Sequence, residues 1–476
     1  MENKKPNIIF LSVDGLRPRN LGCYGYKRDT SPNIDSYASQ GVLFENFFSY
    51  YSVTHKSFSS ILGGRHILAR DFGNYASKRE MNSFFDTGGV LLSEILQKHG
   101  YKTHFLEKLF GWQKKGFDYF FEQDSLEASK KWNLIKSLQK KPLIYNFFKF
   151  ILHNTHLTPK RLESKIRFNN NGERMTNEAI EIIKQNKNNN FFLWLHYDDA
   201  HVPHMFPYAL SKKFTIPSGG KKIFEVLNSM EGYNKKDIDF SRGCWKFDET
   251  IEGLTTKYDT AIFYDDLLIG RIIETLKKEN LLKDTIIFLF ADHGISLGEH
   301  EVYFNNEGVY DVSFNIPLII FGSGIPQNKN VKALTQLEDL APTVLDLIGI
   351  KYDSLSFDGK SLFPLLFGRD KEIRDSIIME EQNAGIKRRA IRTKKYKYME
   401  SPEKEHTVCG ICNTTHGPIT ALYDLEKDPD ENINLAEKNK KVTREMKSKL
   451  DKTLGDLKKL NEKRRIQILI KKNKLL

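Results

Sequence analysis

Carboxylate and imidazole side chains follow directly after two apolar runs of the chain. Asp14 comes after the run 7–13, and the pair Asp292 and His293 comes after the run 285–291. Apolar runs of this length are typical of buried central strands. Oxygen and imidazole ligands at the ends of two such strands could hold a divalent cation together. Each residue taken singly could equally cap a turn or lie in a loop, so the predicted metal site rests on their combination.

A possible nucleophile lies between these residues in the sequence. Thr54 follows a predicted strand at 42–51 and opens a predicted helix that stops at Gly63 and Gly64. A threonine at the start of a helix is most often an N-cap. The same position favours an alkoxide, because the helix dipole and free backbone N–H groups stabilise negative charge and an incoming anion. Both interpretations stay open at this point.

The elements that must position these residues alternate along the chain. Apolar runs predict buried strands at 7–13, 191–196, 285–291 and 316–321, with helical patterns between them, the longest over 254–280. Such alternation predicts a doubly wound α/β sandwich, which binds ligands at the carboxyl ends of its strands. His196 closes the second of these runs and therefore stands out beside Asp14 and Asp292.

The chain is predicted to have three parts. Residues 1–375 form the catalytic domain, with a basic helical insert at 121–188 and a loop-rich roof over the site at 201–250. Residues 376–440 form a small α+β subdomain, because 388–399 alternate as an antiparallel strand does. The last part, 441–476, is a basic amphipathic helix whose apolar positions share one face: Met446, Leu450, Leu454, Leu457 and Leu460.

Composition excludes several classes of protein. The chain has 476 residues, 39% of them hydrophobic and 28% charged, which is typical of a globular protein. No apolar run reaches the ~18 residues of a membrane-spanning helix, and the first apolar stretch is too short for a signal peptide. Four cysteines provide no disulfide framework and suit a reducing compartment. We therefore expect a cytoplasmic protein.

The net charge is +12, from 73 Lys and Arg against 61 Asp and Glu. No nucleic-acid motif accompanies the basic stretches near 128–166 and after 437, so we expect no nucleic-acid partner. The basic end 464–476 is expected either to contact an anionic membrane surface or to remain a solvated helix end. Cys409 and Cys412, with two histidines nearby, could form a small zinc site or a loop with free thiols.

Six motifs occur in one order along the chain. They lie at 14–26 with 30–35, 191–204, 264–266, 292–300, 357–362 and 422–436. Together they resemble the sulfatase family of the alkaline phosphatase superfamily, over about residues 6–436. The resemblance implies an α/β/α sandwich with a mixed, mainly parallel sheet.

The resemblance also implies roles for individual residues. Asp14, Asp292 and His293 would be metal ligands, Thr54 falls at the nucleophile position, and His201 matches the proton donor to the leaving oxygen. Candidate contacts to the substrate are Lys56, Ser57, Lys108, His204 and His300.

The nucleophile position departs from the family pattern. Sulfatases carry a Cys or Ser there, which is matured to formylglycine and followed by a Pro and an Arg. This chain has Thr54, with Lys56 at the Pro position and Phe58 at the Arg position. Threonine cannot become formylglycine, so no formylglycine is expected. The Thr-x-x-Ser pattern is similar to the phosphoethanolamine and phosphoglycerol transferases of the superfamily, which use a threonine nucleophile.

The anion pocket departs from the pattern as well. Gly15 stands where sulfatases usually have a second Asp, which makes calcium less suitable than Zn²⁺, Mn²⁺ or Mg²⁺. Asn306 and Asn315 lie near the positions of a family lysine and arginine, and Phe110 lies at a histidine position. The site is thus expected to keep its metal and to lose several cations.

These residues predict a metal-dependent hydrolase or transferase that cleaves a sulfo- or phospho-ester through Thr54. Chemistry favours a phosphoester, because in-line attack at phosphorus can release the phosphate from a phospho-threonine. A threonine sulfate cannot release sulfate by the elimination that the hydrated aldehyde of formylglycine allows. One alternative is a sulfuric ester hydrolase that works without formylglycine. Another is a non-catalytic member that binds an anionic glycan or lipid headgroup. The expected partner is an anionic small-molecule, glycan or lipid-headgroup ester, and the oligomeric state stays open.

Overall fold

A mixed sheet forms the centre of the computed structural model, which describes residues 5–66, 78–107, 111–121, 171–229, 245, 248–353, 356–383, 386–403, 407 and 417–473. Within these residues the strand order is β10-β2-β9-β6-β1-β5-β3-β4, and β11 pairs with β2. The strands are β1 (Asn7–Val13), β2 (Gly41–Phe48), β3 (Lys102–Leu106), β4 (Tyr119–Phe121), β5 (Phe191–Tyr197), β6 (Thr285–Ala291), β9 (Asn315–Gly322), β10 (Lys329–Val331) and β11 (Thr335–Gln336).

Most neighbours in this sheet run parallel. Strand β1 pairs in parallel with both β5 and β6, whereas β9 is antiparallel to its neighbours β2 and β6. The register pairs Val13 with Tyr197 on one side and with Ala291 on the other. The predicted mixed, mainly parallel sheet is thus confirmed, and the carboxyl ends of β1, β5 and β6 meet at one edge.

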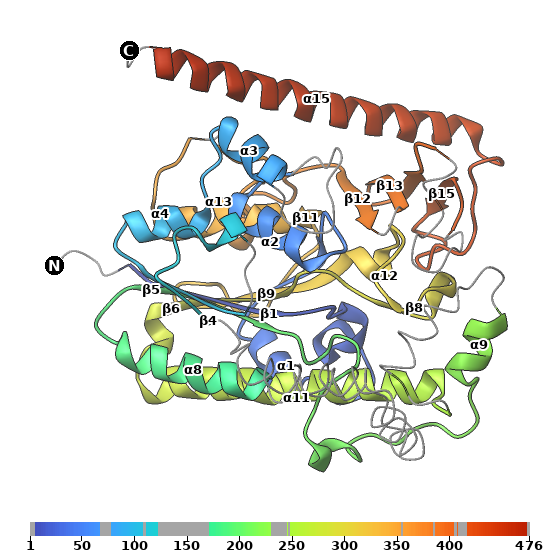
Figure 1. Cartoon of the computed structure of the whole chain (residues 1–476), viewed down its shortest axis with the longest axis horizontal. Helices are drawn as coiled ribbons and strands as arrows, with labels where there is room; N and C mark the ends of the chain where they lie inside the picture. The colour runs from blue at the N-terminus through green and yellow to red at the C-terminus, as the bar shows by residue number, and fades with distance from the viewer. Residues whose placement is uncertain are drawn as a thin grey trace, which may run out of the picture.

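Helices cover both faces of the sheet. Figure 1 shows α1 (Pro32–Ala38), α8 (Asn171–Gln185) and α11 (Ile251–Lys278) on one face. The opposite face carries α2 (Thr54–Gly63), α4 (Leu92–Lys98) and α13 (Leu340–Leu347). This arrangement is the predicted α/β/α sandwich. The further helices are α3 (Lys78–Asp86), α9 (Ile223–Ser229), α12 (Asp311–Phe314), α14 (Phe363–Leu366) and α15 (Lys440–Asn473).

The central strands are apolar throughout because both of their faces are covered. Phe10 of β1 packs against aromatic rings from both neighbouring strands, with centroids 5.2 Å from Phe192 and 5.0 Å from Phe288. All residues of β1, β5 and β6 are buried. Asp14, His196 and Asp292 therefore lie at the carboxyl ends of three strands that are buried throughout.

A smaller antiparallel sheet follows the catalytic domain. Its order is β12-β13-β14-β15, with β12 (Ile377–Asn383), β13 (Ile386–Arg392), β14 (Tyr396–Glu400) and β15 (Thr420–Asp424). The prediction of one strand over 388–399 was wrong, because the backbone reverses where Thr393 N–H donates to Tyr396 O at 2.8 Å. Both arms of this hairpin alternate in the same way, so the pattern alone did not reveal the turn. A two-stranded ribbon of β7 (Ser296–Leu297) and β8 (Tyr303–Asn305) completes the described strands.

Four of the five positions on the predicted apolar face of the C-terminal helix α15 pack on the protein: Met446, Leu450, Leu454 and Leu457. Met446, Leu450 and Leu454 are buried in a cluster that includes Tyr50 and Tyr398. Arg464, further along the helix, is also buried. Among the described helices, none contains a segment of the length and hydropathy that crossing a membrane requires.

Several predicted features lie outside the described residues. They include Lys108, Cys409, Cys412, positions 122–170 of the predicted basic insert, and 230–244 with 246–247 of the predicted roof.

The packing of α15 predicts a stability change. Leu450 is 0% exposed, so Leu450→Ala should lower the free energy of unfolding by about 2–5 kcal/mol, measured by urea denaturation. The matched control is Leu469→Ala on the same helix, where the side chain is 54% exposed and the change should stay within about 0.5 kcal/mol. Equal effects of the two substitutions would contradict this packing.

Candidate active site

Three strand ends bring two of the predicted metal ligands, Asp14 and Asp292, together with His196. Asp14 follows β1, His196 is the last residue but one of β5, and Asp292 follows β6. The parallel register places these ends side by side, and Asp14 N–H donates to Tyr197 O at 2.8 Å. One ligand atom of each of Asp14, His196 and Asp292 lies within 4.8 Å of the others.

The distances within this cluster are short. His196 Nε2 lies 3.7 Å from Asp14 Oδ2 and 4.0 Å from Asp292 Oδ2. His293 Nε2 lies 3.4 Å from Asp14 Oδ1 and 3.4 Å from Asp292 Oδ2. All four side chains are buried. Asp14, His196 and Asp292 thus form the possible metal-binding group, and His293, a predicted ligand, lies beside both of its carboxylates.

The hydrogen bonding of these residues fits a divalent cation at the centre of the cluster. Asp14 Oδ1, His196 Nε2 and Asp292 Oδ2 are buried and have no hydrogen-bond partner. The other ring nitrogens are engaged, because His196 Nδ1 lies 2.8 Å from Ser12 Oγ and His293 Nδ1 lies 2.8 Å from Gly294 O. Contacts of this kind at Nδ1 orient a histidine so that Nε2 can bind a metal.

The pKa values of the clustered residues reflect two carboxylates that are buried close together. Burial and the neighbouring Asp14 raise the pKa of Asp292, although His293 opposes them. Burial also raises the pKa of Asp14, but the positive charges of His201 and His196 outweigh it and bring the pKa below its usual range. Burial lowers the pKa of His196, whereas Asp14 and Asp292 raise it to about 9 overall. A divalent cation at the centre would neutralise this charge.

Thr54 lies at the edge of the cluster. Its hydroxyl donates to Asp14 Oδ2 at 3.3 Å, and its Oγ1 lies 3.3 Å from His293 Nε2. The N-cap position of α2 belongs to Val53, and no side-chain hydrogen bond caps the helix. Thr54 is therefore the first residue of the helix and not its N-cap. Its hydroxyl faces Asp14 and His293. It lies at the N-terminus of α2, where the helix dipole is positive.

Asn306 and Phe58, which lie at positions where the family pattern has a lysine and an arginine, also lie at the cluster. Asn306 Nδ2 lies 3.5 Å from His293 Nε2, and it donates a hydrogen bond to Ser52 O. The ring of Phe58 lies with its centroid 4.8 Å from that of His196, in an edge-on contact. An amide and an aromatic ring thus occupy places where a lysine and an arginine would bring positive charge.

His201 is electrostatically coupled to the cluster. Its exposed ring directs Nδ1 toward Val202 O at 2.8 Å. Desolvation lowers the pKa of His201, but the charge of Asp14 outweighs it and raises the pKa overall. The negative charge of Asp14 therefore stabilises the protonated form of this ring.

Other side chains that were predicted to contact the substrate contact neighbouring residues of the protein. Ser57 Oγ donates to Tyr51 O at 3.4 Å, and Lys56 Nζ lies 5.2 Å from the centroid of the Tyr51 ring. His300 stacks on Tyr310 with centroids 3.7 Å apart.

His204 is buried beside two aromatic rings. It contacts the rings of Tyr258 and Phe304, and burial lowers its pKa to about 3. This ring is therefore neutral at physiological pH.

The sequence did not assign His196 as a ligand, although its place at the end of an apolar run was visible. Gly15 lacks the carboxylate that sulfatases have at that position, and His196 instead brings a nitrogen to the cluster. Mixed nitrogen and oxygen donors suit Zn²⁺ or Mn²⁺ better than Ca²⁺.

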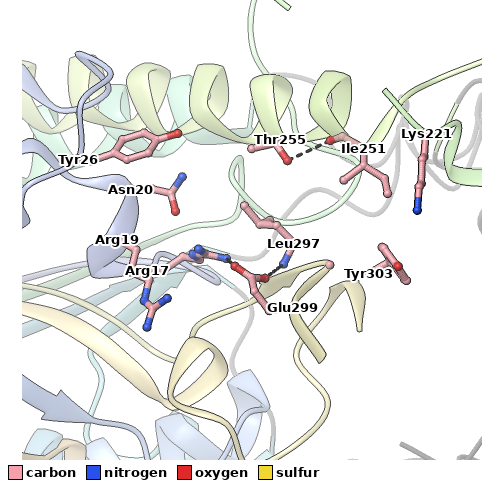
Figure 2. A pocket seen from close by; sticks show the side chains of 11 residues that line it. Arg17, Arg19, Asn20, Tyr26, Lys221, Ile251, Thr255, Leu297, Glu299 and Tyr303 are labelled. Carbon is pink, nitrogen blue, oxygen red and sulfur yellow. Dashed lines mark hydrogen bonds and ion pairs between the residues drawn. The ribbon is translucent and has the colours of Figure 1, made fainter. Parts of the chain in front are cut away.

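A pocket of about 480 Å³ opens beside the loop that follows Asp14 (Figure 2). Three basic residues line it: Arg17, Arg19 and Lys221. Arg17 donates to Ile295 O at 3.3 Å and pairs with Glu299 at 2.9 Å, so it braces the loops after β1 and β6. The pocket therefore adjoins the two loops that begin at Asp14 and at Asp292.

Solved structures with this architecture place the fold in a class. A protein solved in complex with its substrate D-glucosamine-2-N,6-O-disulfate has a TM-score of 0.68 and 18% identity, and the match covers 96% of this chain and 99% of that one. The phosphonate monoester hydrolase of Agrobacterium radiobacter has a TM-score of 0.66 and 18% identity, with 96% of each chain covered. The chain thus shares its fold with these two proteins.

Sequence comparisons identify the family within this class. Residues 6–350 match the Sulfatase family, and residues 298–459 match the C-terminal part of N-sulphoglucosamine sulphohydrolase. Arylsulfatase K of Canis lupus familiaris is 23% identical over 478 residues, which cover 94% of this chain and 82% of the relative. Iduronate 2-sulfatase of Homo sapiens is 26% identical over 356 residues, which cover 67% and 60%. The chain belongs to the sulfatase family and is an ester hydrolase of that family.

The cluster predicts how metal binding depends on Asp292. Asp292→Asn should weaken metal binding at least ~10-fold, measured as metal content of the purified protein. Thermal stability without metal should be unchanged or higher, because one of two close carboxylates loses its charge. Asp370→Asn, at an exposed position, should keep wild-type metal content. Wild-type metal content in Asp292→Asn would exclude this residue as a ligand.

Proposed function

We propose that this sulfatase-family hydrolase cleaves its ester through Thr54, and that a phosphoester is favoured over a sulfate ester. The observation that carries the proposal is the position of the Thr54 hydroxyl, 3.3 Å from both Asp14 Oδ2 and His293 Nε2. The absence of a side-chain cap at Val53 supports it, because the hydroxyl of Thr54 has no role in capping α2.

The proposed ligands of the cofactor are Asp14, His196, Asp292 and His293, with Zn²⁺ or Mn²⁺ favoured by the donor set. Bound there, a divalent cation would lower the pKa of the Thr54 hydroxyl and screen the negative charge of the ester.

In the first step, the Thr54 hydroxyl loses its proton to solvent, and Thr54 Oγ1 forms a bond to phosphorus. The bond from phosphorus to the leaving oxygen breaks at the same time. His201 donates a proton to that oxygen, which departs as a neutral alcohol. The raised pKa of His201 supports its role as an acid.

In the second step, water or an acceptor alcohol attacks the phosphorylated Thr54. The attacking oxygen gives its proton to His201, and the bond from phosphorus to Thr54 Oγ1 breaks. Thr54 regains a proton from solvent, so Thr54 and His201 both return to their initial states. Attack by water makes the enzyme a hydrolase, and attack by an alcohol makes it a transferase.

The chemistry of threonine supports a phosphorus centre. Threonine cannot form the hydrated aldehyde that expels sulfate by elimination, but a phospho-threonine is opened by in-line attack. The phosphonate monoester hydrolase with the same architecture is consistent with phosphorus chemistry in this fold. A sulfuric ester hydrolase that acts through Thr54 is the second candidate, and the names of the relatives favour it.

For the rest of the substrate we propose an anionic glycan. The structurally similar protein bound to D-glucosamine-2-N,6-O-disulfate supports this substrate class. The pocket in Figure 2 is suited to it, because Lys221 and Arg19, which also pairs with Asp430, bring positive charge and Tyr303 brings an aromatic side chain. A second sugar unit with a carboxylate or sulfate would bind there.

Replacement of the nucleophile tests the reaction. Thr54→Ala should lower kcat at least ~10³-fold on matched aryl phosphate and phosphodiester substrates, whereas Thr54→Ser should keep part of the activity. The control Thr275→Ala, on the exposed side of α11, should be unchanged. Intact mass of the stalled wild-type enzyme should reveal a phosphate-derived adduct on Thr54. Turnover of an aryl sulfate with none of the matched phosphoesters would favour the second candidate.

Replacement of the pocket residues tests the substrate class. Arg19→Ala and Lys221→Ala should each raise KM for an anionic oligosaccharide ester about tenfold, and leave KM for a small aryl ester unchanged. Lys283→Ala, at an exposed site after α11, serves as the control. An equal rise in KM for both substrates would exclude the pocket as a separate binding site.

A further inference from the structure

One face of the end of α15 is fixed to the catalytic domain. Arg464 is 3% exposed, and its Nη1 lies 2.8 Å from Asp358 Oδ1, a buried carboxylate. One turn further, Ile468 packs so closely on Gly88 that a Cβ at that glycine would lie 2.8 Å from Ile468 Cδ1. These contacts fix which side of the helix faces outward. Figure 1 shows that α15 runs along the outside of the molecule.

The opposite face of the same turns carries exposed apolar side chains. Ile466, Leu469 and Ile470 are 50%, 54% and 49% exposed. At about 100° per residue they lie roughly 140–240° around the helix from Arg464, so they form one stripe directed away from the protein. Other exposed large apolar residues in the described part of the chain, such as Ile216 and Ile433, are single in the sequence.

Basic residues surround this apolar stripe. Residues 458–476 contain eight Lys and Arg against one Glu. Lys463 and Arg465, beside the stripe, are exposed. An exposed apolar stripe with flanking positive charge is the pattern of helices that lie in the interface of an anionic membrane.

We infer that the end of α15 docks the protein on an anionic membrane surface. Ile466, Leu469 and Ile470 enter the interfacial region, and Lys463 and Arg465 contact the anionic headgroups. A second copy of the chain fits this face poorly, because a two-fold interface would bring the two strongly basic segments together. The inference does not depend on the proposed reaction at Thr54.

Vesicle co-sedimentation of the full-length protein tests this inference. The wild type should bind phosphatidylcholine vesicles that contain phosphatidylglycerol, and binding should fall in high salt and be much weaker with phosphatidylcholine alone. The triple variant Ile466→Ser, Leu469→Ser, Ile470→Ser should partition at least ~10-fold less. The matched control Ile216→Ser, Ile419→Ser, Ile433→Ser removes equally exposed isoleucines elsewhere and should bind as the wild type does.

A second variant covers the case in which the first fails to fold. Lys463→Glu with Arg465→Glu leaves the apolar stripe in place and should also lower binding to the anionic vesicles. Wild-type binding that is absent, or unchanged in both the serine and the glutamate variants, would overturn the inference. So would a stable dimer in analytical ultracentrifugation that the serine variant dissociates, since a second copy would then cover the stripe. Turnover of a small soluble ester should be equal in wild type and variants, which separates this result from the reaction at Thr54.

Discussion

The burial of two close carboxylates, Asp14 and Asp292, is the constraint on which the site depends. Parallel pairing of β1 with β6 places both at one sheet edge, away from water, where unbalanced negative charge is costly. Backbone N–H groups of Gly15 and His293 donate to Asp292 Oδ1 at 3.3 and 2.9 Å and offset part of this cost. The remaining oxygens face two imidazole rings, so the arrangement is suited to a cation that completes the charge balance.

Around this negative centre the chain has less positive charge than the family pattern would supply. Phe58 packs on His196, and Asn306 lies beside His293. For the proposed reaction, a site with few positive side chains suits a transferred group that carries one negative charge, such as a phosphodiester or a sulfate, better than a doubly charged phosphate monoester. Further anionic groups of the substrate would then find their positive partners outside this centre, along the loop that follows Asp14.

The C-terminal part of the chain holds the segment that leads into α2 and Thr54. Glu380 N–H of β12 donates to Tyr50 O at 2.9 Å, and Ser57 Oγ donates to Tyr51 O at 3.4 Å. Both tyrosines belong to the apolar cluster that buries Leu450 of α15. The segment that leads into α2 is therefore held by the small sheet and the long helix. This packing explains why a helix remote in sequence is part of the architecture that positions Thr54.

The apolar runs determined the central strands and the α/β sandwich, because a strand covered on both faces must be apolar throughout. The residues that follow these runs, Asp14, Asp292 and His293, indicated a cation site, whereas the mixed sheet was implied by the family resemblance. The sequence predictions for Lys108 and for a cytoplasmic location stay predictions. Only tertiary structure decided that His196 joins the carboxylates, since this depends on the register of β1 against β5. It also directed His300 onto Tyr310 and turned the chain at Thr393. A local pattern fixes which side chains alternate or share a face, whereas their neighbours are set by pairing between segments hundreds of residues apart.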